Sequence, residues 1–327
     1  MATIDLSDKA RAGRVTSGGV GVEVMQEALA DRRLANVIYH DWEAASYDAK
    51  WSISYDERCI RYARDRFAHV AGTEGWPYAR ALEIGCGTGF FLLNLRQAGV
   101  LADGAVTDIS PGMVEVAQRN ARGLGFEIDG RVADAEALPH ADDQFDLVIG
   151  HAVLHHIPDV EQALREALRV LKPGGRFVFC GEPTRRGDFV ARRLSYLTWR
   201  AASRVTRWPI VRGRFGRPKI DLTESSRMAA LEAIVDIHTF DPANLRRTAV
   251  RAGAIDVETV TEELTASWFG WPVRTVESAV KPGSLGWQWA YFAYFGWMGL
   301  SALDERLLSR VVPEQLFYNV CLTGVKP

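Results

Sequence analysis

The stretch of sequence that decides the fold is Leu82-Glu83-Ile84-Gly85-Cys86-Gly87-Thr88-Gly89. A short apolar run ends in three glycines and opens into a helical pattern. Such turns bind nucleotides, because glycines permit a tight turn and let a ligand approach the backbone. They can also simply join a strand to a helix. The spacing here is G-x-G-x-G, whereas the dinucleotide fingerprint G-x-G-x-x-G would need a glycine in place of Phe90.

The acid at the end of the apolar run, Glu83, narrows the choice of ligand. Helix N-termini and nearby amides already favour anions, so a carboxylate at this point would repel a pyrophosphate. S-adenosylmethionine (SAM) has no phosphate and carries an ammonium and a sulfonium group, both of which a carboxylate attracts. The loop therefore favours SAM over the NAD of an oxidoreductase.

Strands and helices alternate after this loop. We predict strands at residues 81–84, 105–107, 126–132, 145–150 and 176–181, with helices near residues 89–98, 111–121 and 160–171. The helix starts are marked by Ser110-Pro111 and later by Asp241-Pro242, each a capping residue followed by proline. Such alternation predicts right-handed crossovers and a parallel sheet covered by helices on both faces.

Residues 82–89 resemble the first motif of the class I SAM-dependent methyltransferases. The later segments resemble the methyltransferase type 11 branch, which includes ubiquinone- and menaquinone-biosynthesis methyltransferases. The resemblance covers residues 81–183 and, more loosely, residues 241–262 and 315–327. It implies an α/β fold with a Rossmann-like, seven-stranded, doubly wound sheet, a helical N-terminal cap, and insertions that form a lid.

The same resemblance implies a cofactor site. The glycines would approach the methionine part of SAM, with Glu83 near its ammonium group. Asp108 would accept hydrogen bonds from both ribose hydroxyls, Asp134 would contact the adenine, and His151 would face the cofactor. The two aspartates could instead be solvated loop acids. The full predicted cofactor set is Glu83, Gly85, Cys86, Gly87, Gly89, Asp108, Ile109, Asp134, Ala135 and His151.

Methyl transfer is a displacement on a carbon that the sulfonium already activates, so alignment and exclusion of water are the protein's main tasks. A general base is needed only where the acceptor must lose a proton. The candidates near the predicted strand ends are His151, His155, His156 and Glu182, although such histidines often pack or cap, and the glutamate could merely orient a loop. No cluster of acids indicates a magnesium site, so we expect no metal.

Bulk properties fit an intracellular globule. The chain has 327 residues, a net charge of −2 and four scattered cysteines without a C-x-x-C pair, which argues against zinc and against a disulfide framework. The N-terminus does not resemble a signal peptide. The longest apolar stretch, residues 285–300, is shorter than the roughly 20 residues that span a bilayer. We predict a cytoplasmic protein, with peripheral membrane contact as an open alternative.

The chain divides into six predicted segments. They are a disordered tail plus N-terminal helical cap (1–80), the first part of the SAM-binding core (81–183), a basic amphipathic lid insertion (184–240), a core helix and strand (241–263), an aromatic-rich insertion (264–313) and the final core strand (314–327).

The first insertion is strongly basic. From Arg185 to Lys219 there are 11 lysines and arginines and one acid, Asp188. An apolar stripe recurs at spacings of three and four, namely Val190, Leu194, Leu197, Ala201, Val205 and Trp208. A neighbouring stripe holds Arg193, Arg200, Arg204 and Arg207. The pattern predicts a basic amphipathic helix whose apolar face docks on the core, contacts a membrane or flanks an anionic substrate. Nucleic acid is an improbable partner, because no motif for it is present.

The second insertion holds five of the ten tryptophans. Such density packs against the first insertion, lines an apolar acceptor pocket or touches a membrane. We therefore expect a lid over a lipophilic acceptor, with peripheral membrane contact through residues 188–208 and 285–300 as a further hypothesis.

The sequence thus predicts a SAM-dependent methyltransferase of lipid or secondary metabolism, acting on oxygen or carbon of a small, lipophilic metabolite or lipid. The alternative is a SAM-binding protein without turnover that serves as a regulator or assembly partner. The acceptor and the oligomeric state are not indicated.

Overall fold

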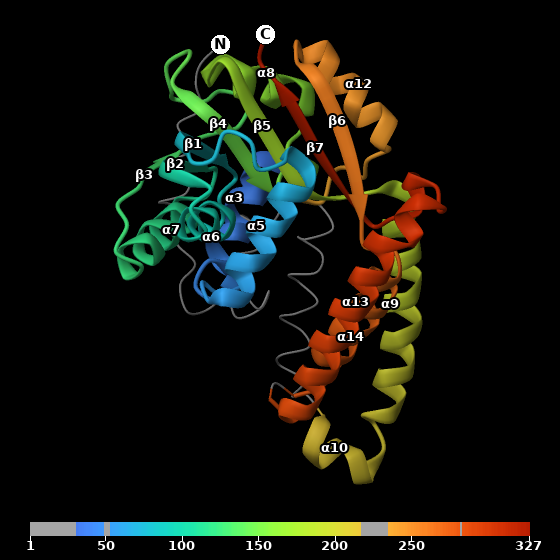
Figure 1. The fold of residues 1–327 in the computed structure, drawn as a ribbon. Coiled ribbons are helices and arrows are strands. Elements are labelled where there is room, and N and C mark those ends of the chain that lie inside the picture. The colour runs from blue at the N-terminus through green and yellow to red at the C-terminus, as the bar shows by residue number, and fades with distance from the viewer. Residues whose placement is uncertain (1–30, 49–52, 217–234, 282) are drawn as a thin grey trace.

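The computed structural model describes residues 31–48, 53–216, 235–281 and 283–327 (Figure 1). Two helices near the N-terminus, α3 (Arg32–Glu43) and α5 (Glu57–Ala71), form the helical cap that was predicted within residues 1–80. The predicted tail at residues 1–20 lies outside the described residues, as does part of the first insertion.

One seven-stranded sheet forms the centre of the molecule, with the strand order β3-β2-β1-β4-β5-β7-β6. The strands are β1 (Tyr78–Ile84), β2 (Leu101–Asp108), β3 (Asp129–Val132), β4 (Phe145–His151), β5 (Leu171–Pro183), β6 (Ile255–Glu262) and β7 (Asn319–Val325). The predicted seven-stranded, doubly wound sheet is confirmed.

The sheet is mixed rather than wholly parallel. Strands β1 to β5 pair in parallel, whereas β7 is antiparallel to both of its neighbours, β5 and β6. The cause lies in the connection from β6 to β7. It consists of two helices that leave and re-enter at the same edge of the sheet, so the returning strand must reverse direction. The expectation of a fully parallel sheet is therefore wrong for this last strand.

Helices cover both faces of the sheet. On one face α8 (Val160–Val170) and α12 (Pro242–Ala252) pack on side chains such as Leu82 and Val148. On the other face α5, α6 (Phe90–Gln97) and α7 (Pro111–Gly123) pack on Ala81 and Leu147. Successive strand residues point to opposite faces, which is why these near-continuous apolar strands bury both sides.

The two insertions form a separate helical projection, which we call the arm. It consists of α9 (Arg185–Val205), α10 (Pro209–Phe215), α13 (Thr265–Ala279) and α14 (Gly286–Arg306). Helix α13 packs against both α9 and α14, and the whole projection extends away from the sheet, with α10 at its far end (Figure 1). Short 3-10 turns complete the fold, at Leu154–His156, Leu308–Arg310 and Glu314–Leu316.

Helix α9 packs its predicted apolar stripe only in part, with Val190 and Leu194 half-buried. Gly187 and Ala191 are its buried residues, whereas Leu197, Val205 and Trp208 of the expected apolar stripe are exposed. The reason is steric. A Cβ on Gly187 would lie 2.5 Å from the Cα of Tyr318, so only a small residue lets α9 approach the chain before β7.

Candidate functional site

The loop between β1 and α6 is shaped by its glycines. Gly85, Gly87 and Gly89 have φ angles of 60°, 50° and 86°, a region that glycine adopts without strain. A Cβ on Gly85 would lie 2.1 Å from a methyl group of Val153, so no side chain fits there. A Cβ on Gly87 would meet only a Tyr47 ring carbon, at 3.9 Å, because this residue faces the open cleft.

Two buried carboxyl groups flank this loop. Glu83 is the penultimate residue of β1, is 1% exposed, and accepts a hydrogen bond from the Leu92 N–H at 3.1 Å. Asp108 ends β2 and accepts the N–H groups of Gly87 and Ser110, each at 2.9 Å. Burial raises the pKa of Glu83 to about 8 and that of Asp108 to about 6.

Neither carboxyl group has a basic partner in the part of the chain that the structure describes. A buried carboxylate without a basic partner is costly, a cost that protonation relieves in the free protein and that a positive ligand group would relieve in the complex. The pair of carboxyl groups therefore fits a cationic ligand and would repel a phosphate.

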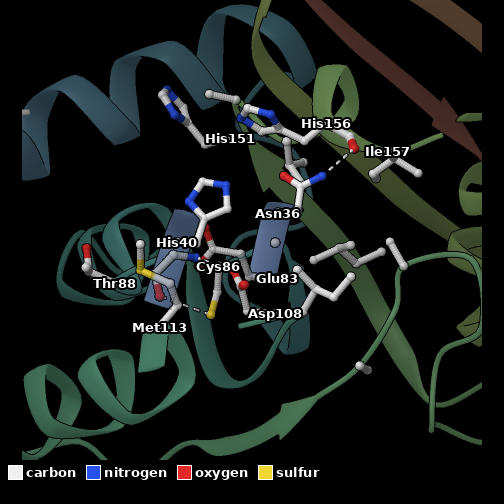
Figure 2. A pocket seen from close by; sticks show the side chains of 18 of the residues that line it. Asn36, His40, Glu83, Cys86, Thr88, Asp108, Met113, His151, His156 and Ile157 are labelled. Atoms are coloured by element: carbon white, nitrogen blue, oxygen red, sulfur yellow. Dashed lines mark hydrogen bonds between the residues drawn. The ribbon is translucent and has the colours of Figure 1, made fainter. Parts of the chain in front are cut away.

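The same cleft is lined by nearly all of the predicted cofactor residues. Besides Glu83, Gly87 and Asp108, these are Gly85, Cys86, Ile109, Asp134, Ala135 and His151. Figure 2 shows several of them around the cleft. Gly89 does not line it. This residue is the N-cap of α6, and a Cβ there would lie 2.9 Å from Leu93 within the core. A glycine is therefore needed here for the turn and its packing.

Asp134 lies at another part of the cleft lining and is already engaged by the N-terminal cap. Arg33 of α3 forms an ion pair with Asp134 at 2.8 Å and a second one with Glu136. The Asp134 carboxylate also accepts the Glu136 N–H at 2.9 Å. Helix α3 is thereby fastened over the loop that follows β3.

Sequence reasoning missed the wall that α3 contributes. Asn36 and His40, one helical turn apart, both line the cleft (Figure 2). The Asn36 amide donates to the backbone oxygen of His156 at 3.3 Å, while its own buried oxygen has no hydrogen-bond partner among the described residues. The sequence does contain a signal for these two residues, because they are polar and spaced by four on an otherwise apolar helical face.

His151 ends β4 and lines the cleft among aromatic rings. Its ring centroid lies 5.3 Å from those of Phe90 and Phe91, and its Nε2 lies 3.4 Å from the hydroxyl of Tyr62. Burial, helped by the nearby Arg66 guanidinium, lowers the pKa of His151 to about 3. The imidazole is therefore neutral at physiological pH.

Tyr62 belongs to a buried polar cluster that the sequence did not indicate. Its hydroxyl also accepts a hydrogen bond from Arg66. That guanidinium forms ion pairs with Glu262 at 2.8 Å and with Glu263 at 2.6 Å. The cluster connects the cap, the end of β6 and the side of the cleft that holds His151.

The other three candidate bases separate into two groups. His156 lines the cleft, and its Nδ1 lies 3.0 Å from the backbone oxygen of Val235. Glu182 and His155 do not line the cleft. Glu182 is fully buried and accepts the N–H groups of residues 153–155, together with His155 Nδ1 at 2.8 Å. These contacts assign Glu182 to holding the turn after β4 in place.

One group of described residues brings metal-type ligand atoms together, namely His155, His156 and Asp236, whose atoms lie within 4.8 Å of one another. The Nδ1 atoms of both histidines are already engaged, by Glu182 and by a backbone oxygen. We assign no metal to this group, and the absence of a metal stays a prediction.

A methyltransferase-domain family model matches residues 82–179. The chain is 31% identical over 173 residues to a demethylmenaquinone methyltransferase of Symbiobacterium thermophilum, a match that covers 52% of the chain and 67% of that relative. The chain belongs to the class I SAM-dependent methyltransferases.

Other members of this family match over a shorter stretch. The 27-O-demethylrifamycin SV methyltransferase of Amycolatopsis mediterranei is 39% identical over 115 residues, which are 34% of this chain and 39% of the relative. A ubiquinone biosynthesis O-methyltransferase of Ruegeria pomeroyi is 39% identical over 117 residues, 35% and 46% of the two chains. The chain thus spans about two fifths to two thirds of the length of the curated relatives it matches.

A solved structure shares the fold. Phosphoethanolamine N-methyltransferase 2 of Haemonchus contortus, in complex with SAM, has a TM-score of 0.53 at 15% identity and covers 95% of this chain and 61% of its own. SAM is the cofactor of the family, so the prediction of SAM as the cofactor is confirmed. The family model ends at residue 179, which leaves the arm outside the match.

Proposed function

We propose that this methyltransferase transfers the methyl group of SAM to oxygen or carbon of a small, lipophilic metabolite or lipid. The observation that carries the proposal is the pair of buried carboxyl groups, Glu83 and Asp108, beside the glycine loop without a basic partner among the described residues. A cationic ligand would stabilise both groups in their charged form, and SAM supplies an electrophilic methyl group when bound.

Each end of the cleft has a proposed role in holding the cofactor. Glu83 would face the ammonium group and Asp108 the ribose, while the open backbone at Gly87 lets the ligand approach closely. Asp134 and Ala135 would border the adenine. The unpartnered oxygen of Asn36 offers one more acceptor, which is suited to an N–H or O–H donor of the ligand.

An aromatic wall supports the choice of a lipophilic acceptor. The Phe90 ring packs on His151 and on Tyr62, at centroid distances of 5.3 and 5.9 Å, and the Tyr62 ring in turn contacts Trp297 of the arm at 6.2 Å. Apolar rings exclude water and align an apolar acceptor. The neutral His151 would orient an acceptor hydroxyl by accepting its hydrogen bond.

The predicted lid stays a prediction, because the described arm helices contribute no residue to the lining of the cleft. In our proposal the acceptor enters beside the arm, near Trp297. The peripheral membrane contact that we expected for residues 188–208 and 285–300 would lie on the same side of the molecule as this entrance.

The test is incubation of the purified protein with methyl-labelled SAM and fractionated cell extract. We expect label to partition into the organic phase, and we expect an Asp108→Ala variant to lose this signal. Label in protein would overturn the proposed acceptor class. Normal SAM binding by calorimetry with no label in any fraction would instead support the alternative, a SAM-binding regulator or assembly partner without turnover.

A further inference from the structure

An ordinary surface helix buries its large apolar side chains, whereas the helices of the arm expose many of theirs. Most of the fully buried residues of α9 and α13 are small, namely Gly187, Ala191, Ala266, Ser267 and Ala279. Ala191 of α9 is buried, and Gly296 of α14 is so close to Phe269 that a Cβ would lie 2.6 Å from the ring. The outer surface instead carries large apolar side chains: Phe189, Tyr196, Leu197, Trp199, Val205, Trp208, Ile210, Trp268, Trp287, Tyr291, Phe292, Tyr294, Phe295 and Met298 are exposed.

Exposure of this many large apolar side chains is unfavourable in water, and exposed apolar surface on a soluble protein often marks an interaction site. Such a placement of small and large residues is typical of helices that meet lipid, where small residues bring helices together and large residues face outward. None of the helices in the described part of the chain combines the length and the apolar character that crossing a bilayer requires. The arm is therefore suited to lie at a membrane surface rather than across it.

The charges on α9 and α10 indicate which kind of membrane surface the arm would bind. Residues 185–215 contain nine arginines, all exposed, and one acid, Asp188, which is paired with Arg192 at 2.6 Å. Two of these arginines stack over exposed rings of the same helix, Arg193 over Phe189 and Arg200 over Tyr196. Arginine beside exposed aromatic rings is the composition of helices that bind anionic lipid headgroups.

The tip of the arm combines exposed apolar side chains with exposed basic ones. The backbone N–H of Lys281 donates to the oxygen of Phe215 at 2.9 Å, which joins the end of α10 to the turn between α13 and α14. Around this junction Trp208, Ile210 and Trp287 are exposed by 64%, 96% and 70%. The basic residues of the tip are Arg207, Arg212, Arg214 and Lys281, all of them exposed.

The nearest competing occupant is a second copy of the chain. A two-fold contact through this face would bring two copies of the same basic patch close together, since a two-fold interface uses the same patch twice. Phosphate headgroups compensate the arginines, and the headgroup region accepts tryptophan and tyrosine rings. The charge pattern therefore favours lipid over self-association.

We propose that the tip of the arm (residues 206–216, 280–281 and 283–291) inserts into the headgroup region of an anionic lipid bilayer. Trp208, Ile210 and Trp287 are the apolar anchors, and the arginines of α9 and α10 contact the lipid phosphates. This inference concerns a surface rather than the cleft, and it holds whether or not the proposed methyl transfer is found.

The first experiment is co-sedimentation of the whole protein with vesicles of phosphatidylcholine alone or of phosphatidylcholine with 30% phosphatidylglycerol. We expect binding to the anionic vesicles that weakens with salt. The charge-reversed variant Arg207→Glu/Arg212→Glu/Arg214→Glu is expected to lower the partition coefficient at least about 100-fold, because each basic residue near such a surface contributes about 1 kcal/mol. The matched control Arg61→Glu/Arg122→Glu/Arg247→Glu carries the same net charge on the body of the molecule and should bind far better.

The second experiment tests insertion itself. Brominated lipids quench tryptophans that reach the bilayer, so a Trp208→Phe/Trp287→Phe variant should lose most of the quenching while remaining bound. Replacing the apolar anchors, as Trp208→Ser/Ile210→Ser/Trp287→Ser, should weaken binding, whereas Val250→Ser/Ile255→Ser on the body should not.

Three results would overturn the proposal. They are equal binding to neutral and anionic vesicles, equal binding by the two charge-reversed variants, and a dimer in sedimentation velocity that the tip substitutions dissociate. Calorimetric titration with SAM, carried out on every variant, separates a failure of membrane docking from a failure of the cofactor site.

Discussion

The sheet and the arm follow opposite rules for the placement of side chains. In the sheet, large apolar residues such as Phe145 and Phe177 are fully buried, and the glycines lie where the backbone must approach a ligand or another chain segment. In the arm, most of the fully buried residues are small, and many large apolar residues are exposed. The difference teaches that the two parts are built for different surroundings, the sheet for its own core and the arm for an external surface.

The largest effect is expected in the core, where substitution of Glu182 should lower the free energy of unfolding. In Glu182→Ala, the N–H groups of Val153, Leu154 and His155 lose their acceptor within a buried turn. Because each unpaired buried group costs about 1–3 kcal/mol, we expect the free energy of unfolding to fall by about 3 kcal/mol or more. Urea denaturation measures this. Glu258→Ala on the exposed side of β6 is the control and should stay within about 0.5 kcal/mol. An equal response of both variants would contradict a structural role for Glu182.

The next effect is on the cofactor site. Asp108→Ala removes the carboxylate that bonds the Gly87 N–H and, in our proposal, the ribose. We expect SAM affinity, measured by calorimetry, to fall about 100-fold, since charge-assisted hydrogen bonds contribute about 1.5–3 kcal/mol each. Asp103→Ala, on the exposed beginning of the same strand, should leave the affinity unchanged. Undiminished affinity in Asp108→Ala would remove Asp108 from the site.

The pH dependence of binding comes third. With a pKa of about 8, Glu83 carries a proton in the free protein below that pH, and the proton must leave before the carboxylate can face a cation. SAM affinity should therefore rise up to about tenfold per pH unit between pH 6 and 8 and then level off. Calorimetry across this range measures the slope. Glu83→Gln should flatten the profile, and a wild-type profile that is already flat would contradict the proposed role of Glu83.

The core was predictable from sequence for a physical reason. Short-range rules decide it: three glycines force the turn after β1, and capping residues followed by proline start α7 and α12. These local features are readable without knowing what the chain contacts. The positions of Glu83 and Asp108 at strand ends followed from the same logic, because the carboxyl ends of parallel strands share one edge of the sheet.

The remaining errors arise from long-range contacts. Spacing showed that α9 has an apolar stripe, but not that Tyr318 would lie so close to Gly187 that the small face packs inward. The antiparallel β7 depended on how the α13–α14 connection returns. Asn36 and His40 could be found from their spacing on α3, whereas Tyr62 lies beside His151 through tertiary packing of the cap, which no local pattern specifies. Glu182 was a candidate base because its strand end is near the cleft, with the alternative that it orients a loop, and its oxygens point to the turn after β4.

The smallest effect on SAM affinity is expected where the arm contacts the body of the protein. Trp297 is the residue of the arm whose ring contacts Tyr62, with a centroid distance of 6.2 Å, and Tyr62 in turn lies beside His151. If the arm serves an external surface, Trp297→Leu should change SAM affinity by less than about twofold, because the tryptophan contacts the site only through another ring. Calorimetry at one pH suffices, with Tyr62→Phe measured in parallel as the step closer to the cleft. A loss of tenfold or more in Trp297→Leu would show that the arm stabilises the cofactor site directly. The arm would then have to be treated as part of the catalytic body rather than as a separate docking element.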